Sequence, residues 1–236
     1  MADAVAPLSR TAASQAVAGT GWRYLLGTLS ASVPVRSLGR SAEVGAAAVE
    51  ACGEQADRHL RVDLRSDRAE LSLQDRSVGA LTAKDAELAH AVTAALEQLG
   101  AAIAPPVTVL YPRPVQMLEI GIDAMNIPAI RPFWKAVLGY ADEPGHDGVQ
   151  DAIVDPVGQL PAVWFQQMDA PRPQRNRMHM DITVAHDEAQ ARLAAAVAAG
   201  GTVVRDADAP AYWVLADQEG NEACICTWQN RDERAV

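Results

Sequence analysis

A histidine stands inside a polar–apolar alternation in the segment RNRMHMDITV, residues 175–184. Such an alternation is typical of a strand whose two faces meet different surroundings. His179 is therefore either a polar residue on the solvent-exposed face of this strand or a side chain that enters a pocket. Imidazole titrates near neutral pH and also binds metal ions, so in a pocket it would transfer protons or hold an ion.

The cysteines are the second group with reactive potential, and the chain has three: Cys52, Cys224 and Cys226. An odd and sparse set fits a reducing compartment better than a disulfide scaffold. Cys224 and Cys226 are two residues apart, so on a strand they point the same way. This is not CxxC spacing, and no second cysteine pair completes a zinc site. We expect each cysteine to be buried and structural.

Charge and composition exclude several classes of partner. The 236 residues carry a formal net charge of −10, which argues against binding nucleic acid or an anionic membrane surface. No segment reaches the roughly 18 consecutive apolar residues of a membrane span. The N-terminal MADAVAPLSRTAASQAVAG lacks the basic start of a signal peptide, so we expect a cytoplasmic protein.

Helix and strand patterns divide the chain into three zones. Residues 101–115, AAIAPPVTVLYPRPV, are rich in proline and predict a linker between two folded parts. The zone before it predicts a helix over 41–57, two strands within 60–75 that turn near Ser66–Asp67, and a helix over 81–100. Thr82 and Asp85 predict a capping box at the start of that last helix, and Gly100 predicts its end.

The zone after the linker predicts the same βαβββ order twice, which is an internal structural repeat. In the first helix of this zone Asn126 is the expected cap and Gly139 the expected end, and in the second helix Gly200 and Gly201 are the expected end. In the first copy the pattern locates a strand over 116–123, a helix over 126–140 and only two of the three following strands, over 148–156 and 159–169. The second comprises a strand over 177–184, a helix over 187–201 and strands over 202–206, 211–217 and 221–228.

Four segments of this zone, in this order and spacing, resemble the glyoxalase-like branch of the vicinal oxygen chelate (VOC) superfamily. They are FWKAVLGY (133–140), RNRMHMDITV (175–184), AAGGTVVRD (198–206) and LADQEGNEACIC (215–226). The resemblance covers residues 116–230. It implies two curved sheets, each with a helix behind it, that pair to enclose a cup lined by the inward strand positions.

The resemblance also implies where a metal ion would bind, with one ligand from each of four strands. Those positions fall on Glu119, Gln166, His179 and Cys224. Only Glu119 and His179 are good ligands, and two do not complete a site, so we expect no metal ion and no other cofactor. If an ion does bind, these two residues are the candidate ligands.

Without an ion, the same positions would be the polar lining of a ligand cup. The resemblance then implies that His179 and Glu119 act as acid and base. The alternative is that the two residues have only a structural role, such as a hydrogen bond of His179 with Asp181. Two tryptophans on strands that should line the cup could hold a planar aromatic ligand. The expected substrate-binding residues of the cup are Trp164, Gln166, Asp181, Trp213 and Cys224.

Residues 8–98 resemble the pterin carbinolamine dehydratase family, on GW (21–22), the stretch 56–92 and GALTAKD (79–85). A gapless alignment places the family's His-His-Pro triplet on Arg58, His59 and Leu60, and its third histidine on Arg76. Guanidinium groups stay protonated, so only His59 could act as an acid or base. Arg58 and Arg76 could bind an anionic ligand, or they are solvated surface charges.

These patterns predict an α+β protein in which a pterin-dehydratase-like α+β domain precedes a double βαβββ (VOC) domain. The expected parts are an N-terminal segment (1–18), the first domain (19–100), the linker (101–115), the second domain (116–230) and a tail (231–236). We expect a homodimer that binds a small organic molecule and acts as a lyase or isomerase. The alternatives are a non-catalytic binding protein of the bleomycin-resistance type and a 4a-hydroxytetrahydrobiopterin dehydratase that uses His59.

Overall fold

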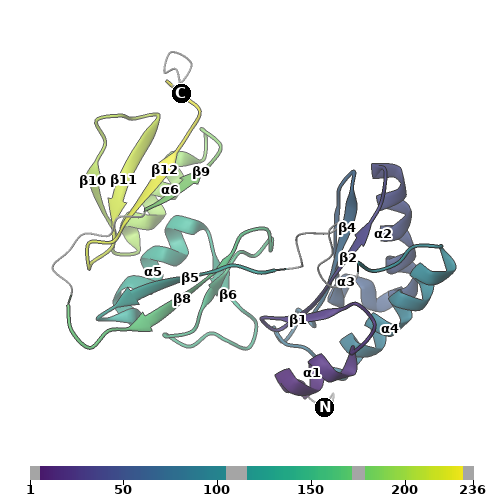
Figure 1. The fold of residues 1–236 in the computed structure, drawn as a ribbon. Helices are drawn as coiled ribbons and strands as arrows, with labels where there is room; N and C mark the ends of the chain where they lie inside the picture. Colours follow the sequence, from purple (N-terminus) through teal and green to yellow (C-terminus); the bar gives the residue numbers. More distant parts are fainter. Residues whose placement is uncertain (1–5, 105–115, 172–178, 231–236) are drawn as a thin grey trace. The chain divides into compact units, whose positions relative to one another are not determined.

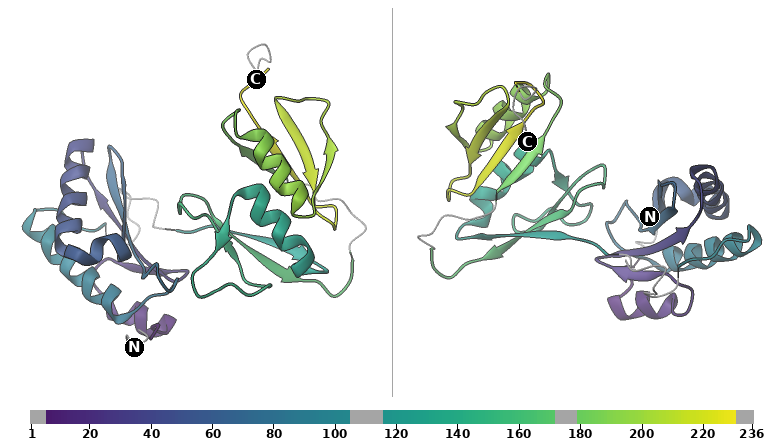
Figure 2. Two further views of the ribbon diagram at one scale, coloured as in Figure 1. Left: turned by 180° about the vertical axis from the view of Figure 1, so that it is seen from behind. Right: turned by 45° about the horizontal axis from the view of Figure 1, so that its top comes forward.

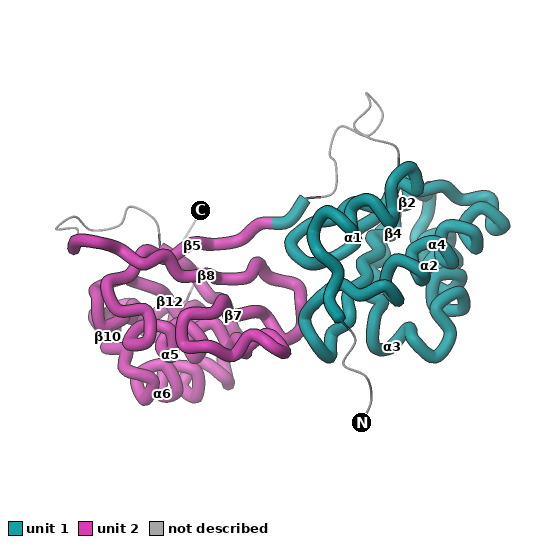
Figure 3. The backbone as a smooth tube through the Cα atoms, turned by 90° about the horizontal axis from the view of Figure 1, so that it is seen from below, with its two compact units in different colours: residues 1–117 teal, residues 118–236 magenta. Residues whose placement is uncertain are grey.

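The computed structural model describes residues 6–104, 116–171 and 179–230. The chain divides into two compact units, Met1–Met117 and Leu118–Val236, which Figure 3 colours separately. Each unit has its own hydrophobic core, and helices and sheets occur in both, which confirms the α+β class. Most of the predicted linker and the whole predicted tail lie outside the described residues. In the described ranges, no helix is both long and apolar enough to cross a membrane.

The first unit contains a four-stranded antiparallel sheet in the order β1-β2-β4-β3 (Figure 1). Its strands are β1 (Arg23–Leu25), β2 (Thr28–Pro34), β3 (Leu60–Leu64) and β4 (Arg68–Leu73). The predicted strand pair with its turn near Ser66–Asp67 is confirmed. The β1–β2 hairpin was not predicted. It turns at Leu26 and Gly27, whose φ angles of 42° and 77° are those of a tight hairpin turn.

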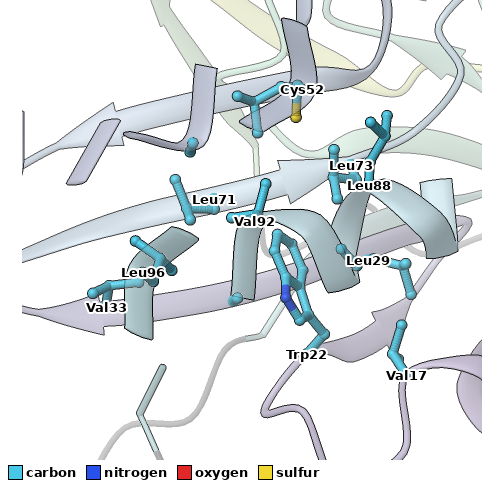
Figure 4. Packing of buried hydrophobic residues seen from close by; sticks show 14 of the residues in the cluster. Val17, Trp22, Leu29, Val33, Cys52, Leu71, Leu73, Leu88, Val92 and Leu96 are labelled. Carbon is cyan, nitrogen blue, oxygen red and sulfur yellow. The ribbon is translucent and has the colours of Figure 1, made fainter. Parts of the chain in front are cut away.

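Helices pack on this sheet and complete the core of the first unit. They are α1 (Arg10–Ala16), α2 (Leu38–Cys52), α3 (Ala56–His59) and α4 (Ala83–Gln98), with a 3-10 turn at Gly53–Gln55. The predicted helix over 41–57 is therefore divided, because Gly53 adopts a φ of 53° and ends α2. Trp22 is fully buried in this core beside Val92 (Figure 4), and its Nε1 donates to Thr93 Oγ1 at 3.1 Å.

The second unit has the predicted βαβββ order twice, so the internal repeat is confirmed. The first copy comprises β5 (Glu119–Ala124), α5 (Ile127–Leu138), β6 (Ala141–Asp142), β7 (Ile153–Val154) and β8 (Ala162–Gln167). The second comprises β9 (Met180–Thr183), α6 (Ala189–Ala198), β10 (Thr202–Arg205), β11 (Tyr212–Ala216) and β12 (Glu222–Cys226). The sheets run β5-β8-β7-β6 and β9-β12-β11-β10, and in each the first and last strands of the copy pair in parallel.

Local signals place most of these elements, and two details differ from the prediction. Asn126 caps α5 by accepting from Ala129 N, and Gly139 ends the helix in the left-handed conformation, as expected. The predicted strand over 148–156 is reduced to Ile153–Val154, and β6 was not predicted. Residues 177 and 178 of the predicted strand over 177–184 lie outside the described residues, and β9 begins at Met180.

The two helices of the second unit pack against each other and share one core with both sheets (Figure 2). Phe133 of α5 lies so close to Gly201 that a Cβ there would be 2.3 Å from its ring. The neighbouring Trp134 donates from Nε1 to the buried Asp217 at 3.0 Å. Since the helices cover the inner face of each sheet, the opposite face of each sheet points away from this core. We call these two surfaces the open faces.

Candidate functional site

The open face of the β9–β12 sheet is the surface beside which His179 lies. Met180 and Ile182 pack against the core, so Asp181 lies on the other face by the alternation of a strand. Ala223 and Ile225 of β12 likewise belong to the core, which places Cys224 between them on the open face. His179 directly precedes β9 and is exposed.

Strand register brings three of these side chains together. β9 and β12 are parallel neighbours, and Asp181 lies directly opposite Cys224. His179 Nε2 is 3.3 Å from Asp181 Oδ1, and both side chains are more than half exposed. One potential ligand atom from each of the three residues lies within 4.8 Å of the others. His179 therefore has Asp181 and Cys224 as its close partners.

Cys224 differs from its two partners in being buried, with 7 % of its surface exposed. Burial disfavours the charged thiolate and raises the pKa of Cys224 to about 12, and the hydrogen bond with Asp181 adds to the rise. The thiol is therefore protonated and a poor nucleophile at neutral pH.

The open face of the β5–β8 sheet carries a tryptophan and a carboxylate. Ile120 and Ile122 pack against the core, so Glu119 and Gly121 lie on the open face, and both are exposed. Trp164 is opposite Gly121 in the parallel register. A Cβ at Gly121 would be 3.0 Å from two atoms of the Trp164 ring, so the indole lies directly over this glycine.

Gln166 shares this open face, two residues after Trp164, and is exposed. Its Nε2 donates to the carbonyl of Gln167 at 3.2 Å. Gln166 lies opposite Asp123 of β5, a carboxylate that was not among the predicted site residues. The pattern that could have found Asp123 is the alternation of β5, because it is the next polar residue on the face of Glu119.

Trp213 corrects one expectation. Its place on a strand predicted that it lines the cup, but Trp213 pairs with Ile225 and belongs to the core beneath the sheet. It is 8 % exposed, whereas Trp164 is 39 % exposed. The two tryptophans lie in different sheets, and only Trp164 is on an open face. A planar ligand between them, as the sequence suggested, does not fit this arrangement.

The described part of the chain does not gather the four predicted ligand positions. Glu119 and Gln166 lie on one open face, and His179 and Cys224 lie on the other. In the described residues, the three-ligand group around His179 contains Asp181 and Cys224 but not Glu119. The expected cup is therefore not closed by the two copies of βαβββ within one chain, because their helices pack against each other between the sheets.

The first unit holds the other predicted site residues, and each is already engaged. Arg58 donates from Nε and one terminal nitrogen to the two oxygens of Asp75, at 2.8 and 2.6 Å. This bidentate contact keeps the pKa of Asp75 well below its usual range. Arg76 donates to the carbonyls of Leu60, at 3.0 Å, and Asp57. These contacts fix the chain around the end of β4.

His59 is buried, with 3 % of its surface exposed. Its Nδ1 is 2.7 Å from Asp85 Oδ1, and the other oxygen of Asp85 accepts from the backbone N and the hydroxyl of Thr82. The histidine thus belongs to the predicted capping box of α4, which the structure confirms. A buried imidazole held in this way favours a structural role over proton transfer to a pterin.

Comparison with known families assigns the second unit. Its residues 119–226 match the family model described as the glyoxalase-like domain. Residues 119–226 form a glyoxalase-like domain. The glyoxalase-like domain expected at 116–230 is therefore confirmed for residues 119–226. The resemblance of the first unit to pterin carbinolamine dehydratases stays a prediction.

Several solved structures are similar to part of this chain. A glyoxalase/bleomycin resistance protein/dioxygenase family enzyme from Burkholderia phytofirmans PsJN is 17 % identical, covers 46 % of this chain and 95 % of its own, and has a TM-score of 0.38. A glyoxalase-related enzyme from Fulvimarina pelagi is 21 % identical, with coverages of 48 % and 87 % and a TM-score of 0.37.

The third is the fosfomycin resistance protein FosX from Mesorhizobium loti, which is 7 % identical, with coverages of 47 % and 90 % and a TM-score of 0.37. These likenesses carry no activity to this chain. Comparison with curated proteins gives no match.

The metal site implied by the VOC resemblance does not fit the residues of the glyoxalase-like domain. A hard divalent ion takes oxygen and imidazole ligands. Glu119 and Gln166 lie on a different open face from His179. The thiol of Cys224 stands where the resemblance implies a carboxylate. Among the residues that the structure describes, Asp181 is the additional oxygen donor near His179. From the sequence, Asp181 was expected as a substrate contact or as a hydrogen-bond partner of His179. Its closeness to Cys224 was not expected, because that depends on the pairing of β9 with β12.

Proposed function

We propose that the glyoxalase-like domain binds a small organic molecule in a cup that two copies of the chain complete. The observation that carries this proposal is the division of the candidate residues between two open faces. Glu119 and Trp164 would line one half of each cup. His179 and Asp181 of the second copy would line the other half. The partner in this proposal is an identical chain, and the ligand is a small molecule.

The edges of the two sheets support this pairing. β5 and β9 are edge strands, and each pairs with one neighbour in the described part of the chain. An edge strand presents a row of backbone groups that can pair with another strand. These are also the strands that carry or adjoin Glu119, His179 and Asp181. If β5 of one copy meets β9 of the other, the two half-sites come together twice in one symmetric dimer.

The proposed chemistry is that of a lyase or isomerase. Glu119 is exposed and would remove a proton from a carbon next to a carbonyl group. His179 would donate a proton to the oxygen or return one to carbon, because an imidazole can act as a general acid or a general base. The indole of Trp164 over Gly121 would form an apolar floor beneath the ligand. No step of this scheme needs Cys224, whose thiol stays protonated.

The test begins with a panel of small keto, hydroxy-acid and planar aromatic compounds, screened by the thermal shift of the whole protein. Compounds that stabilise it are then incubated with the protein in D2O, and exchange of the proton next to the carbonyl is followed by NMR. We expect exchange with the natural chain and its loss in Glu119→Gln and in His179→Ala. Exchange that persists unchanged in both variants would contradict the proposal.

Mixing the two inactive variants tests the shared cup. In a mixed dimer, one cup carries both substitutions and the other carries neither. Equal mixing with free exchange of subunits should restore about a quarter of the natural number of cups. A mixture that stays as inactive as its components would show that Glu119 and His179 do not act across two copies.

A non-catalytic binding protein is the second candidate, and the exposed Trp164 platform favours it. Stacking on an indole needs no acid or base. In that case compounds of the panel stabilise the protein without proton exchange. Trp164→Ala would then abolish the thermal shift, while Trp228→Ala, which removes an exposed tryptophan after β12, would leave it unchanged.

A further inference from the structure

We propose that the first unit binds a small soluble phosphate monoester on the face of its sheet that points away from its helices. Each of the four strands contributes one side chain to this site. In the order in which the strands lie in the sheet, they are Arg23, Ser30, Ser72 and Arg61, and we call them the Arg–Ser row. The site goes beyond the proposed function, because it uses no residue of the glyoxalase-like domain.

Strand register places the Arg–Ser row in one line across the sheet. Arg23 is opposite Ser30, and Ser30 is opposite Ser72. Ser72 is in turn opposite Arg61. Opposite residues of antiparallel strands have Cβ atoms about 4.5–5.5 Å apart. Each arginine therefore lies beside a serine, and the two serines lie beside each other.

The alternation of the strands turns the whole row away from the core. Leu29 precedes Ser30, Leu73 follows Ser72, and both leucines are buried in the core of the first unit. The neighbours of the two arginines pack on the same core. Helices α2 and α4 cover that side of the sheet (Figure 1). The members of the row lie on the opposite side, where each is exposed or half-buried.

The two serine hydroxyls are available to a ligand. In the described part of the chain, neither Ser30 Oγ nor Ser72 Oγ takes part in a hydrogen bond. Ser32, the next hydroxyl of β2 on this face, instead donates to Glu70 at 3.1 Å. Each hydroxyl can donate one hydrogen bond, so the serine pair can bind two oxygens of one tetrahedral anion.

The two arginines supply the charge that such an anion needs. A guanidinium group has five N–H donors in a fork that fits phosphate oxygens in pairs. Arg23 donates to the carbonyl of Trp22 at 2.9 Å through one terminal nitrogen, which leaves other donors for a ligand. A phosphate monoester carries about −1.5 to −2 charges at pH 7, which two guanidinium groups match. A carboxylate carries only one charge and should bind less tightly.

The other charges of this face are already paired. Arg65 forms an ion pair with Asp63, and Arg68 forms ion pairs with Asp67 and Glu70. The Arg–Ser row therefore adds positive charge to a face that is otherwise close to neutral. The net charge of −10 belongs mostly to the second unit, where acidic residues outnumber basic ones two to one. The acidity of the whole chain does not exclude an anion site in the first unit.

An NMR titration of the whole protein with methyl phosphate, in a buffer without phosphate, tests the site. We expect saturable shifts of the Ser30 and Ser72 amide signals, and weaker binding of acetate. Arg23→Gln and Arg61→Gln should each lower the affinity by about 10–100-fold, because each removes hydrogen bonds between charged groups. Ser72→Ala should lower it by about 2–10-fold.

Two matched variants control for charge and for the loss of a hydroxyl. Arg65→Gln removes the same charge near the end of β3, and Ser32→Ala removes the next hydroxyl of β2. Both should bind methyl phosphate as tightly as the natural protein. Circular dichroism checks the fold of every variant. If Arg23→Gln loses its fold with the contact to Trp22, then Arg61→Gln and Ser72→Ala decide the question.

Three results would overturn the site: no saturable binding of methyl phosphate, equal losses of affinity in Arg61→Gln and Arg65→Gln, or acetate that binds as tightly. Sedimentation with vesicles that contain phosphatidic acid tests a lipid source of the same chemical group. Binding to these vesicles without binding of methyl phosphate would contradict a soluble ligand. The outcome is separable from that of the cup, because Glu119→Gln should bind methyl phosphate as the natural protein does.

Discussion

Asp75 shows how a single residue of the first unit couples charge to folding. It is 1 % exposed, and it accepts hydrogen bonds from Arg58 and from the backbone and hydroxyl of Ser77. Because these donors stabilise the carboxylate, the pKa of Asp75 is lowered in the folded state. Its contribution to stability is therefore present above the pKa of the unfolded chain and is lost as the pH falls below it.

The Asp75→Asn substitution should lower the free energy of unfolding at pH 7 by about 1–3 kcal/mol, since it weakens the contact with Arg58. The difference from the natural protein should shrink as the pH falls below about 4, where unfolded aspartate becomes protonated. Urea unfolding at several pH values measures this. Asp63→Asn is the control, because its pair with Arg65 is about half exposed and should contribute little. If the difference in the free energy of unfolding between Asp75→Asn and the natural protein grows on acidification, the role given to Asp75 is wrong.

Helix α4 depends on a buried network at its first turn. Asp85 accepts from the backbone N and hydroxyl of Thr82 and is paired with the buried His59. Replacing it would remove the cap and leave polar groups of Thr82 and His59 buried without partners. Both losses act on the same element, the junction of α3 with the start of α4.

We therefore expect Asp85→Ala to lower the free energy of unfolding by about 2–4 kcal/mol, as the sum of a lost cap and a buried unpaired donor. Glu87→Ala is the matched control on the same helix. Glu87 pairs with Lys84 on the surface and should contribute about 0.5 kcal/mol or less. Chemical denaturation followed by circular dichroism compares them, and similar losses in both variants would refute the network.

The packing of α5 against the start of β10 makes a second prediction at the scale of elements. A Cβ at Gly201 would lie within 2.4 Å of two ring carbons of Phe133, which is fully buried. Gly201→Ala should therefore destabilise the protein by about 1–3 kcal/mol through overpacking. Gly39→Ala in α2 is the opposite case, because its Cβ would meet only Ser37 Oγ at 3.9 Å.

Alanine at position 39 should stabilise the protein by up to about 1 kcal/mol, since alanine forms helix better than glycine. Thermal unfolding of the two variants gives the comparison. Equal and small effects would mean that the contact of Phe133 with Gly201 relaxes without cost, and that α5 is less tightly fixed than the structure shows.

At the scale of the whole molecule, the oligomeric state decides whether the two open faces can form a shared cup. If two copies complete each cup, light scattering should give twice the 25.1 kDa mass of the chain. Reversing the charge at the β5 edge with Glu119→Lys should weaken the dimer only if this strand lies in the interface. The control Glu87→Lys changes the charge of a surface residue in the first unit. A monomer at all accessible concentrations would contradict the shared cup.

Local sequence signals determined most of the elements of this protein. The capping box of Thr82 and Asp85, the cap at Asn126 and the left-handed Gly139 depend only on neighbouring residues, and the structure confirms them. The repeat of βαβββ also follows from local periodicity. The β1–β2 hairpin escaped prediction because the buried face of β2 includes the small Ala31, and its turn begins at Leu26, a residue that rarely adopts a positive φ.

The arrangement of the candidate site was decided by tertiary structure alone. The sequence placed His179 in a strand, but only the parallel pairing of β9 with β12 sets Cys224 opposite Asp181. Trp213 lies opposite Ile225 and faces the core, whereas Trp164 lies opposite Gly121 on an open face. Strand register and the packing of α5 on α6 depend on contacts between distant residues. The sequence therefore supplied the chemical groups of the site, and the packing of the two sheets decided which of them meet.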